Sequence, residues 1–400
     1  MTIHNCTAGW VGMGLLLSVC RPASGLEVLD GFQVHGFASQ SYFLTSDNNL
    51  FGDSDEEEGS LDFTETGLNV SWVPLPALQI AAQGLFRRAG EGHEHDFELD
   101  YGLVDYSVIA TVNGQFGLRL GRIKNPLGLY NDTRDVAFTR PSILLPQSIY
   151  FDRTRKFALS ADGAQLYGGY QSAWGNWTAQ VGPVFPQVGD RDTELALFGG
   201  RDLPGELDND LSLIGRLTYE ISGLRLALTA VDANIDYDPA VPPPGDLAAG
   251  EIEFQPWIFS AQYSTEDWTF TGEYAERRFE FQGFGPGIPD QEFDGESYYI
   301  QAAYRFHPKW ELMARYDALF TDRNDRDGLK FKARTGAPAN TRFGKDWTVG
   351  MRFDLTPSIM LRAEYHHVNG TAWLPVQDNP DLTALTREWD LYALLVAFRF

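Results

Sequence analysis

Basic side chains gather in one segment of an otherwise acidic chain. The 400 residues contain 31 Lys and Arg against 55 Asp and Glu, a formal net charge of −24. Between residues 122 and 162 the balance reverses, with Arg122, Lys124, Arg134, Arg140, Arg153, Arg155 and Lys156 against Asp132, Asp135, Asp152 and Asp162. The planar guanidinium of arginine binds carboxylate, phosphate or sulfate through paired hydrogen bonds. We therefore expect this segment to meet polar anions, with its own carboxylates opposite its arginines.

Other groups of reactive residues carry weaker signals. His93 and His95 form an H-x-H pair beside Glu91, Glu94 and Asp96, and such a pair can bind zinc or copper. No third ligand stands at a defined spacing, so we predict no metal site. The sequence contains no G-x-S-x-G motif and no nucleophile beside an identifiable base. An enzyme and a bound cofactor are therefore not expected.

Residues 1–25 are predicted to be a secretory signal peptide, and residues 26–400 a single domain. Ala8 to Cys20 is an uncharged apolar run, too short for a membrane-spanning helix, and Ala23-Ser24-Gly25 offers a small-x-small cleavage site. No Lys or Arg precedes this run, which is unusual for a signal peptide. Both cysteines lie within the segment, so residues 26–400 would contain no thiol. The acidic net charge argues against nucleic-acid binding, which requires a basic surface.

Sixteen segments alternate between apolar and polar residues with a period of two, the pattern of β-strands. They lie near residues 30–42, 63–73, 78–88, 98–112, 115–124, 164–171, 176–182, 211–220, 224–234, 253–263, 268–281, 297–306, 310–321, 346–355, 359–369 and 388–400. Short turns such as "VNG" and "TPS" alternate along the chain with longer connections rich in Gly, Pro, Asp and Asn. A membrane β-barrel has this rhythm because one rim carries tight turns and the other carries long loops. The predicted fold class is therefore all-β, a 16-stranded antiparallel transmembrane β-barrel.

The predicted strands separate apolar from charged residues. An apolar face suits lipid outside the barrel, and a face with charges of both signs suits a water-filled interior. The expected charged lining of that interior, the pore wall, is Arg87, Arg119, Arg216, Arg225, Arg277, Arg305, Arg315, Arg352, Arg362, Asp317 and Glu364. Few of the inward positions are expected to be aromatic.

Tryptophans stand at both ends of the predicted strands. Those beside short turns are Trp72, Trp177, Trp268 and Trp310, and those that begin strands after long connections are Trp257, Trp347 and Trp389. Because amphipathic rings prefer membrane interfaces, we expect two girdles of tryptophan around the barrel.

The last strand ends in an alternating apolar run. Its members on one face are Tyr392, Leu394, Val396, Phe398 and Phe400. This ending resembles the carboxy-terminal assembly signal of bacterial outer-membrane barrels, with Tyr392, Phe398 and Phe400 as the signal residues. The resemblance implies recognition by the barrel-assembly machinery and a place in the outer membrane of a Gram-negative bacterium, in contact with lipid and lipopolysaccharide.

By architecture, residues 26–400 also resemble the superfamily of 16-stranded outer-membrane porins. "GRIKNPLGLYN", residues 121–131, is similar to the end of strand 5 in phosphate-selective-type porins, although Ile123 occupies the usual aromatic position. The resemblance implies a homotrimer, passive diffusion of small hydrophilic solutes, and a third long loop, 125–163, folded inward as a constriction. The charged members of that constriction would be Arg134, Arg140, Arg153, Arg155, Lys156, Asp132, Asp135 and Asp152.

Several selectivities and roles fit this sequence. A basic constriction would prefer anions, whereas arginines paired with wall carboxylates would hold the loop in place without selectivity. Acidic outer loops, residues 47–62 and 189–210, would instead favour cations at the mouth. A sugar-specific channel would need aromatic residues along the lumen, for which the third loop offers Phe138, Tyr150, Phe151 and Phe157. An outer-membrane hydrolase is the remaining alternative, and the histidine pair of the second loop would contact a neighbouring subunit in a trimer.

Overall fold

The fold is taken from a computed structural model that describes residues 26–55, 58–91, 97–241 and 246–400. Within these ranges, sixteen antiparallel strands form a closed barrel: β2 (Phe32–Thr45), β3 (Ser60–Leu75), β4 (Leu78–Ala89), β5 (Phe97–Ala110), β6 (Gly114–Lys124), β7 (Ser160–Ser172), β8 (Gly175–Pro186), β10 (Ser212–Ile221), β11 (Leu224–Pro239), β12 (Gly250–Ser264), β13 (Trp268–Gln282), β14 (Gln291–His307), β15 (Trp310–Phe320), β16 (Phe343–Thr356), β17 (Ile359–Gly370) and β18 (Glu388–Arg399). β18 pairs with β2 to close the sheet, with Tyr392 opposite Leu44. The predicted 16-stranded antiparallel barrel is confirmed, and each predicted segment overlaps one of these strands, in order.

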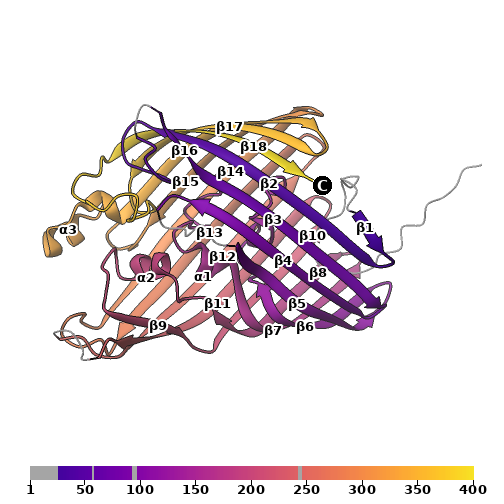
Figure 1. Cartoon of the computed structure of the whole chain (residues 1–400), viewed down its shortest axis with the longest axis horizontal. Helices are drawn as coiled ribbons and strands as arrows, with labels where there is room; N and C mark the ends of the chain where they lie inside the picture. Colours follow the sequence, from indigo (N-terminus) through magenta and orange to yellow (C-terminus); the bar gives the residue numbers. More distant parts are fainter. Residues whose placement is uncertain (1–25, 56–57, 92–96, 242–245) are drawn as a thin grey trace, which may run out of the picture.

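Shorter elements accompany the barrel. The short strand β1 (Leu26–Leu29) pairs with β2, and β9 (Gly205–Asn209) pairs with the end of β11. The helical segments within the connections are α1 (Arg155–Leu159), α2 (Arg191–Leu197), α3 (Leu329–Thr335) and the 3-10 turns Asn131–Thr133 and Ala339–Arg342. Figure 1 shows α2 and α3 at one end of the barrel, and the C-terminus and β1 at the other.

The two rims differ as the sequence predicts, with tight turns at one and long connections at the other. The longest connection joins β6 to β7 and covers residues 125–159, called loop 3 below. It was predicted to end at residue 163, but β7 already pairs with β6 from Ser160 onward, opposite Lys124. Several strands extend in this way past their predicted ends, because lipid no longer imposes alternating apolar residues beyond the hydrocarbon layer.

Apolar side chains cover the outer face of the barrel. Leu394 of β18 exposes 54% of its surface on this face, whereas the next residue, Leu395, is buried inside. The same alternation places Tyr392 and Phe398 outward, as predicted. A closed sheet satisfies its own backbone hydrogen bonds, so an apolar outer belt of this kind suits hydrocarbon. Among the described residues, no helix is long and apolar enough to cross a membrane.

The predicted tryptophan girdles are correct at every position except one. Trp72, Trp177 and Trp268 are exposed near the short turns, and Trp347 is exposed near the long connections. Trp389 is the correction, because it is buried inside the barrel. There it packs on the ring of Trp373, with 5.4 Å between ring centres, and its Nε1 donates to the backbone oxygen of Gly370 (3.2 Å). Its position in β18 has the parity of the inward Leu395 and not that of the outward Tyr392.

Candidate functional site

Loop 3 crosses the interior of the barrel. Arg140 Nη2 donates to Glu65 Oε2 of β3 (2.8 Å), and Tyr150 Oη donates to Glu273 Oε2 of β13 (2.6 Å). In the strand order, β3 and β13 lie on nearly opposite sides of the barrel. Both carboxylates are buried. The loop therefore reaches from one wall to the other.

Several of the predicted constriction residues form a buried ionic network. Arg155 of loop 3 and Lys124 at the end of β6 both contact Asp135, and Arg134 Nη2 lies 3.7 Å from Asp152 Oδ1. Arg134 and Arg155 are almost fully buried. A buried charge is costly unless an opposite charge and hydrogen bonds accompany it, so these contacts hold the fold of the loop.

The remaining predicted constriction residues lie near the walls. Asp132 Oδ2 accepts from Arg216 Nη2 of β10 (2.5 Å). Lys156 Nζ donates to Glu98 Oε1 of β5 (2.6 Å), and both of these side chains are exposed. Arg153 lies beside the ring of Phe151, with 5.7 Å from the guanidinium carbon to the ring centre.

Most of the predicted pore-wall residues point inward and anchor loop 3. Five of them donate to its backbone oxygens: Arg216 to Gly128 (2.8 Å), Arg277 to Ser148 (2.8 Å), Arg315 to Leu144 (3.1 Å), Arg352 to Phe138 (3.4 Å) and Arg362 to Arg140 (2.6 Å). Glu364 accepts from the backbone N–H of Ile143 (2.5 Å), and Arg87 donates to Asp152 (2.7 Å). Buried backbone groups must find partners, and these side chains supply them. Asp317 is buried on β15, opposite Asp346 of β16.

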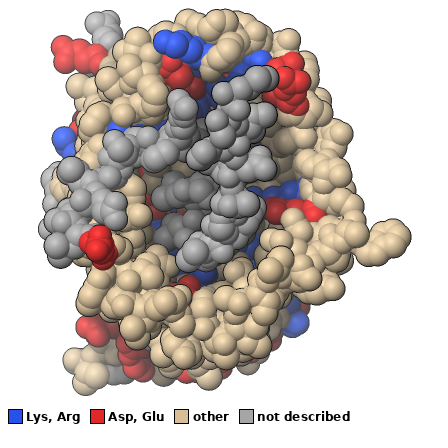
Figure 2. All heavy atoms as spheres, turned by 90° about the vertical axis from the view of Figure 1, so that its right-hand side faces the viewer, with Lys and Arg blue, Asp and Glu red and all other residues tan. Residues whose placement is uncertain are grey.

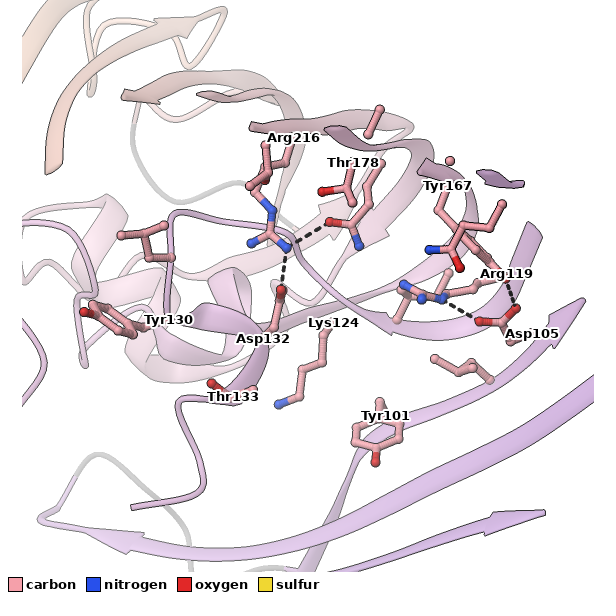
Figure 3. Close-up of a pocket in the computed structure, with 18 of the residues that line it drawn as sticks. Tyr101, Asp105, Arg119, Lys124, Tyr130, Asp132, Thr133, Tyr167, Thr178 and Arg216 are labelled. Carbon is pink, nitrogen blue, oxygen red and sulfur yellow. Dashed lines mark hydrogen bonds and ion pairs between the residues drawn. The ribbon is translucent and has the colours of Figure 1, made fainter. Parts of the chain in front are cut away.

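A polar cavity of about 390 Å³, called the charged hollow below, lies between loop 3 and the wall formed by β4 to β8 and β10 to β12. Its charged lining residues are Asp105, Arg119, Lys124, Asp132, Arg216, Glu220 and Arg225. Figure 3 shows two ion pairs inside it, Arg119 with Asp105 (2.9 Å) and Arg216 with Asp132. Arg225 lies 3.2 Å from Glu220. The lining therefore presents both signs of charge, arranged in pairs.

The charged hollow reaches toward the rim of short turns. Its lining includes Gln115, Glu220 and Arg225, each one residue from the end of a strand at a short turn. Figure 2 looks onto this rim and shows basic and acidic side chains inside a ring of other residues. Such a lining can solvate small polar solutes and ions.

A second, apolar cavity of about 70 Å³ lies on the long-connection side of loop 3 and is called the apolar pocket below. On β10, Ser212 and Ile214 line this pocket, whereas Thr218 and Glu220 line the charged hollow. Its aromatic lining residues are Phe151 and Phe157 of loop 3 and Phe254 of β12.

The expectation of few inward aromatic residues on the strands is wrong. Phe254 contacts both Phe157 (5.8 Å between ring centres) and Phe279 of β13 (4.5 Å), inside the barrel. Beyond them, Tyr237 of β11 and Phe281 of β13 belong to a buried apolar cluster. Phe254, Phe279 and Phe281 lie within the predicted strands, whereas Tyr237 lies beyond the predicted end of its strand at residue 234. Reading the period of two onward through Tyr237 would have placed that ring inside.

Two of the predictions concern residues outside the described part of the chain. These are the signal peptide, 1–25, and the pair His93 and His95. Both stay predictions. Among the described residues, no group of three or more His, Cys, Asp or Glu could hold a metal ion.

No family model and none of the curated proteins matches this sequence, but solved structures do. The outer-membrane channel DcaP of Acinetobacter baumannii has a TM-score of 0.61 and 12% identity, covering 94% of this chain and 100% of that one. The anion-selective porin from Comamonas acidovorans has a TM-score of 0.57 and 11% identity, covering 92% and 99%. Salmonella typhi OmpF has a TM-score of 0.55 and 13% identity, covering 93% and 98%. At such low identity the likeness shows the fold, which is that of the 16-stranded outer-membrane porins.

Proposed function

We propose that this barrel, which has the fold of 16-stranded outer-membrane porins, is itself a porin in the outer membrane of a Gram-negative bacterium. Small hydrophilic solutes diffuse through it passively, with a modest preference for anions, and no reaction is catalysed. Lipid and lipopolysaccharide surround it, the barrel-assembly machinery inserts it, and it works as a homotrimer.

The charged hollow is the observation that carries this proposal. It lies beside loop 3, reaches the rim of short turns and is lined by paired charges, so it supports passage of water and small polar solutes. Its charged lining residues are four basic ones (Arg119, Lys124, Arg216 and Arg225) and three acidic ones (Asp105, Asp132 and Glu220). The lining thus has one more basic than acidic side chain, which supports a preference for anions; the preference is weak because Lys124 also pairs with Asp100 and Asp135 outside the lining.

A cysteine placed in the charged hollow tests the proposal directly. Thr178 lines the hollow, and Val181 on the same strand is exposed on the outer face. Because both natural cysteines lie at positions 6 and 20, a single introduced thiol in residues 26–400 is the only one there. Thr178→Cys and Val181→Cys channels would be recorded in planar bilayers before and after addition of methanethiosulfonate reagents.

We expect modification of Thr178→Cys to lower the conductance, because a bulky group then occupies the hollow. The Val181→Cys channel should keep its conductance. A negatively charged reagent should modify Thr178→Cys faster than a positively charged one if the hollow prefers anions. Equal reaction rates for the two reagents would contradict the proposed anion preference. If the Thr178→Cys channel reacted but kept its conductance, the charged hollow would not be part of the path taken by solutes.

A further inference from the structure

Arg277 lines the apolar pocket, and a second arginine, Arg153, lies beside the pocket residue Phe151. Arg277 Nη1 donates to the backbone oxygen of Ser148 (2.8 Å), but its Nη2 is buried and has no hydrogen-bond partner. The Nε of Arg153 is likewise buried without one. Among the described residues, neither guanidinium forms an ion pair with a carboxylate, and the charged neighbours that act on Arg277 and Arg153 are other arginines. In the charged hollow, by contrast, Arg119 has such a partner.

The two guanidiniums share one aromatic ring. The guanidinium carbon of Arg277 lies 4.7 Å from the centre of the Phe151 ring, and that of Arg153 lies 5.7 Å from the same centre. The ring quadrupole attracts cations but does not neutralise their charge. Two positive charges therefore meet at Phe151, and Arg277, which is only 6% exposed, has been withdrawn from water. A buried guanidinium that lacks a carboxylate partner favours binding of an anion.

The rest of the pocket favours an apolar group. Phe157, Phe254 and Ile258 line it together with aliphatic side chains of β8, β10 and β11. A hydrated inorganic anion would leave this surface without a partner and would lose part of its own water. An anion that also carries an apolar body would satisfy both parts of the pocket. The cavity of about 70 Å³ limits that body to one small ring, accommodated with a shift of the half-buried Phe157.

We infer that the apolar pocket binds an aromatic carboxylate, with the ring against Phe157 and Phe254 and the carboxylate accepting from Arg277 Nη2. The inference deepens the proposed function and rests on it, because the pocket lies in the lumen through which solutes would pass. It makes aromatic acids a substrate class of the channel. Arg153 adds a second positive charge beside the bound carboxylate.

Isothermal titration calorimetry with benzoate, on the full chain folded in detergent, tests this inference. Benzyl alcohol supplies the ring without the charge, and inorganic phosphate supplies charge without the ring. We expect both to bind at least tenfold more weakly than benzoate. Arg277→Gln should weaken benzoate binding about 10- to 100-fold, since a hydrogen bond to a charged group is lost in a buried site.

The matched control is Arg278→Gln, which alters the next residue of β13. Arg278 is exposed and pairs with Glu280 (3.0 Å) and Glu292 (2.9 Å), so its loss should leave benzoate affinity unchanged. Phe254→Ala, which keeps every charge, should also weaken benzoate binding. It tests the inference if the Arg277→Gln variant does not fold. Benzoate that binds no better than phosphate or benzyl alcohol would overturn the inference. A barrel that conducts ions but does not bind benzoate would overturn it while leaving the proposed porin function intact.

Discussion

The charged hollow and the apolar pocket use arginine in opposite ways on the two sides of loop 3. In the hollow, Arg119 and Arg216 each face a carboxylate, and the lining stays polar and nearly neutral. At the pocket, Arg277 in its lining and Arg153 beside it face the ring of Phe151, and no described carboxylate pairs with them. Paired charges create a path that tolerates many polar solutes. Unpaired charges beside apolar side chains create a site that selects one class of anion.

Substitution of Glu65 should cause the largest change in stability and conductance, because Glu65 holds loop 3 and both cavities depend on the position of that loop. Its buried carboxylate contacts three arginines: Arg87 (3.3 Å), Arg140 (2.8 Å) and Arg155 (3.4 Å). Glu65→Ala should destabilise the barrel by about 3–5 kcal/mol, since it leaves buried guanidiniums without a partner. Urea unfolding would measure that loss, and single-channel recording should show larger, noisier conductance as the loop loosens.

A matched control for Glu65 is Glu98, whose carboxylate pairs with Lys156 at the exposed side of loop 3. Glu98→Ala should cost no more than about 1 kcal/mol, as exposed ion pairs do. If Glu65→Ala also cost only that much and left the conductance unchanged, the loop would not be held by its ion network.

A smaller loss of stability is expected from a change at the closing seam, the pairing of β18 with β2 that closes the barrel. Gly36 of β2 exchanges backbone hydrogen bonds with Phe400 (3.0 and 3.2 Å), and a Cβ at Gly36 would lie 2.3 Å from the Phe400 ring. Gly36→Ala should therefore destabilise the barrel by about 1–3 kcal/mol through forced movement of the ring. The ion selectivity of the Gly36→Ala channel should equal that of the wild type, because the change affects the stability of the barrel and not its solute path.

Gly168→Ala is the control for the seam, because a Cβ there meets nothing closer than 3.6 Å. It should leave urea unfolding nearly unchanged. A Gly36→Ala barrel as stable as the wild type would show that the Phe400 ring does not need its place over β2.

Changing one charge at a time in the hollow should shift ion preference in opposite directions. Arg225→Gln removes a positive charge and should move the zero-current potential toward cation selectivity. Glu220→Gln, which alters its partner 3.2 Å away, should move the potential toward anions. Arg277→Gln in the apolar pocket should change the benzoate response more than the KCl potential. If Arg225→Gln and Glu220→Gln gave the same zero-current potential, ions would not pass through the charged hollow.

The smallest expected effect is a dependence of the conductance on pH, which arises in the long connections at the mouth of the barrel. Asp192 of α2 accepts a hydrogen bond from Gln377 in the connection between β17 and β18, which joins two sides of the mouth. Burial, helped by the charge of Asp190, raises the pKa of Asp192 from 3.8 to about 7. Because the folded pKa is the higher one, burial of Asp192 in the packed connections is most stable below pH 3.8, and this stability is lost as pH rises through about 7. Single-channel conductance should therefore rise between pH 5 and pH 8.

Asp192→Asn should flatten that pH dependence, because the amide cannot ionise. Asp53→Asn, which alters an exposed residue of the first connection, should keep it. A wild-type conductance that falls as pH rises would contradict the sign of the expected change.

The sequence predicts the barrel well because lipid imposes a strict rule on it. Outward residues must be apolar, so the period of two in β18 placed Tyr392 and Phe398 correctly. Partners across the lumen follow no such rule. That Arg140 meets Glu65, 75 residues away, depends on how loop 3 crosses the barrel, which no local pattern encodes. The apolar pocket was missed for the same reason, since Phe157 and Phe254 come together only in the folded lumen.

The zero-current potential of the purified protein in a planar bilayer, under a KCl gradient, tests the central claim most directly. We expect stepwise conductance with a weakly anion-selective potential, because the charged hollow contains one more basic than acidic side chain. A cation-selective potential would contradict the assignment of the hollow as the filter. No conductance at all from the folded barrel would contradict the proposed porin function.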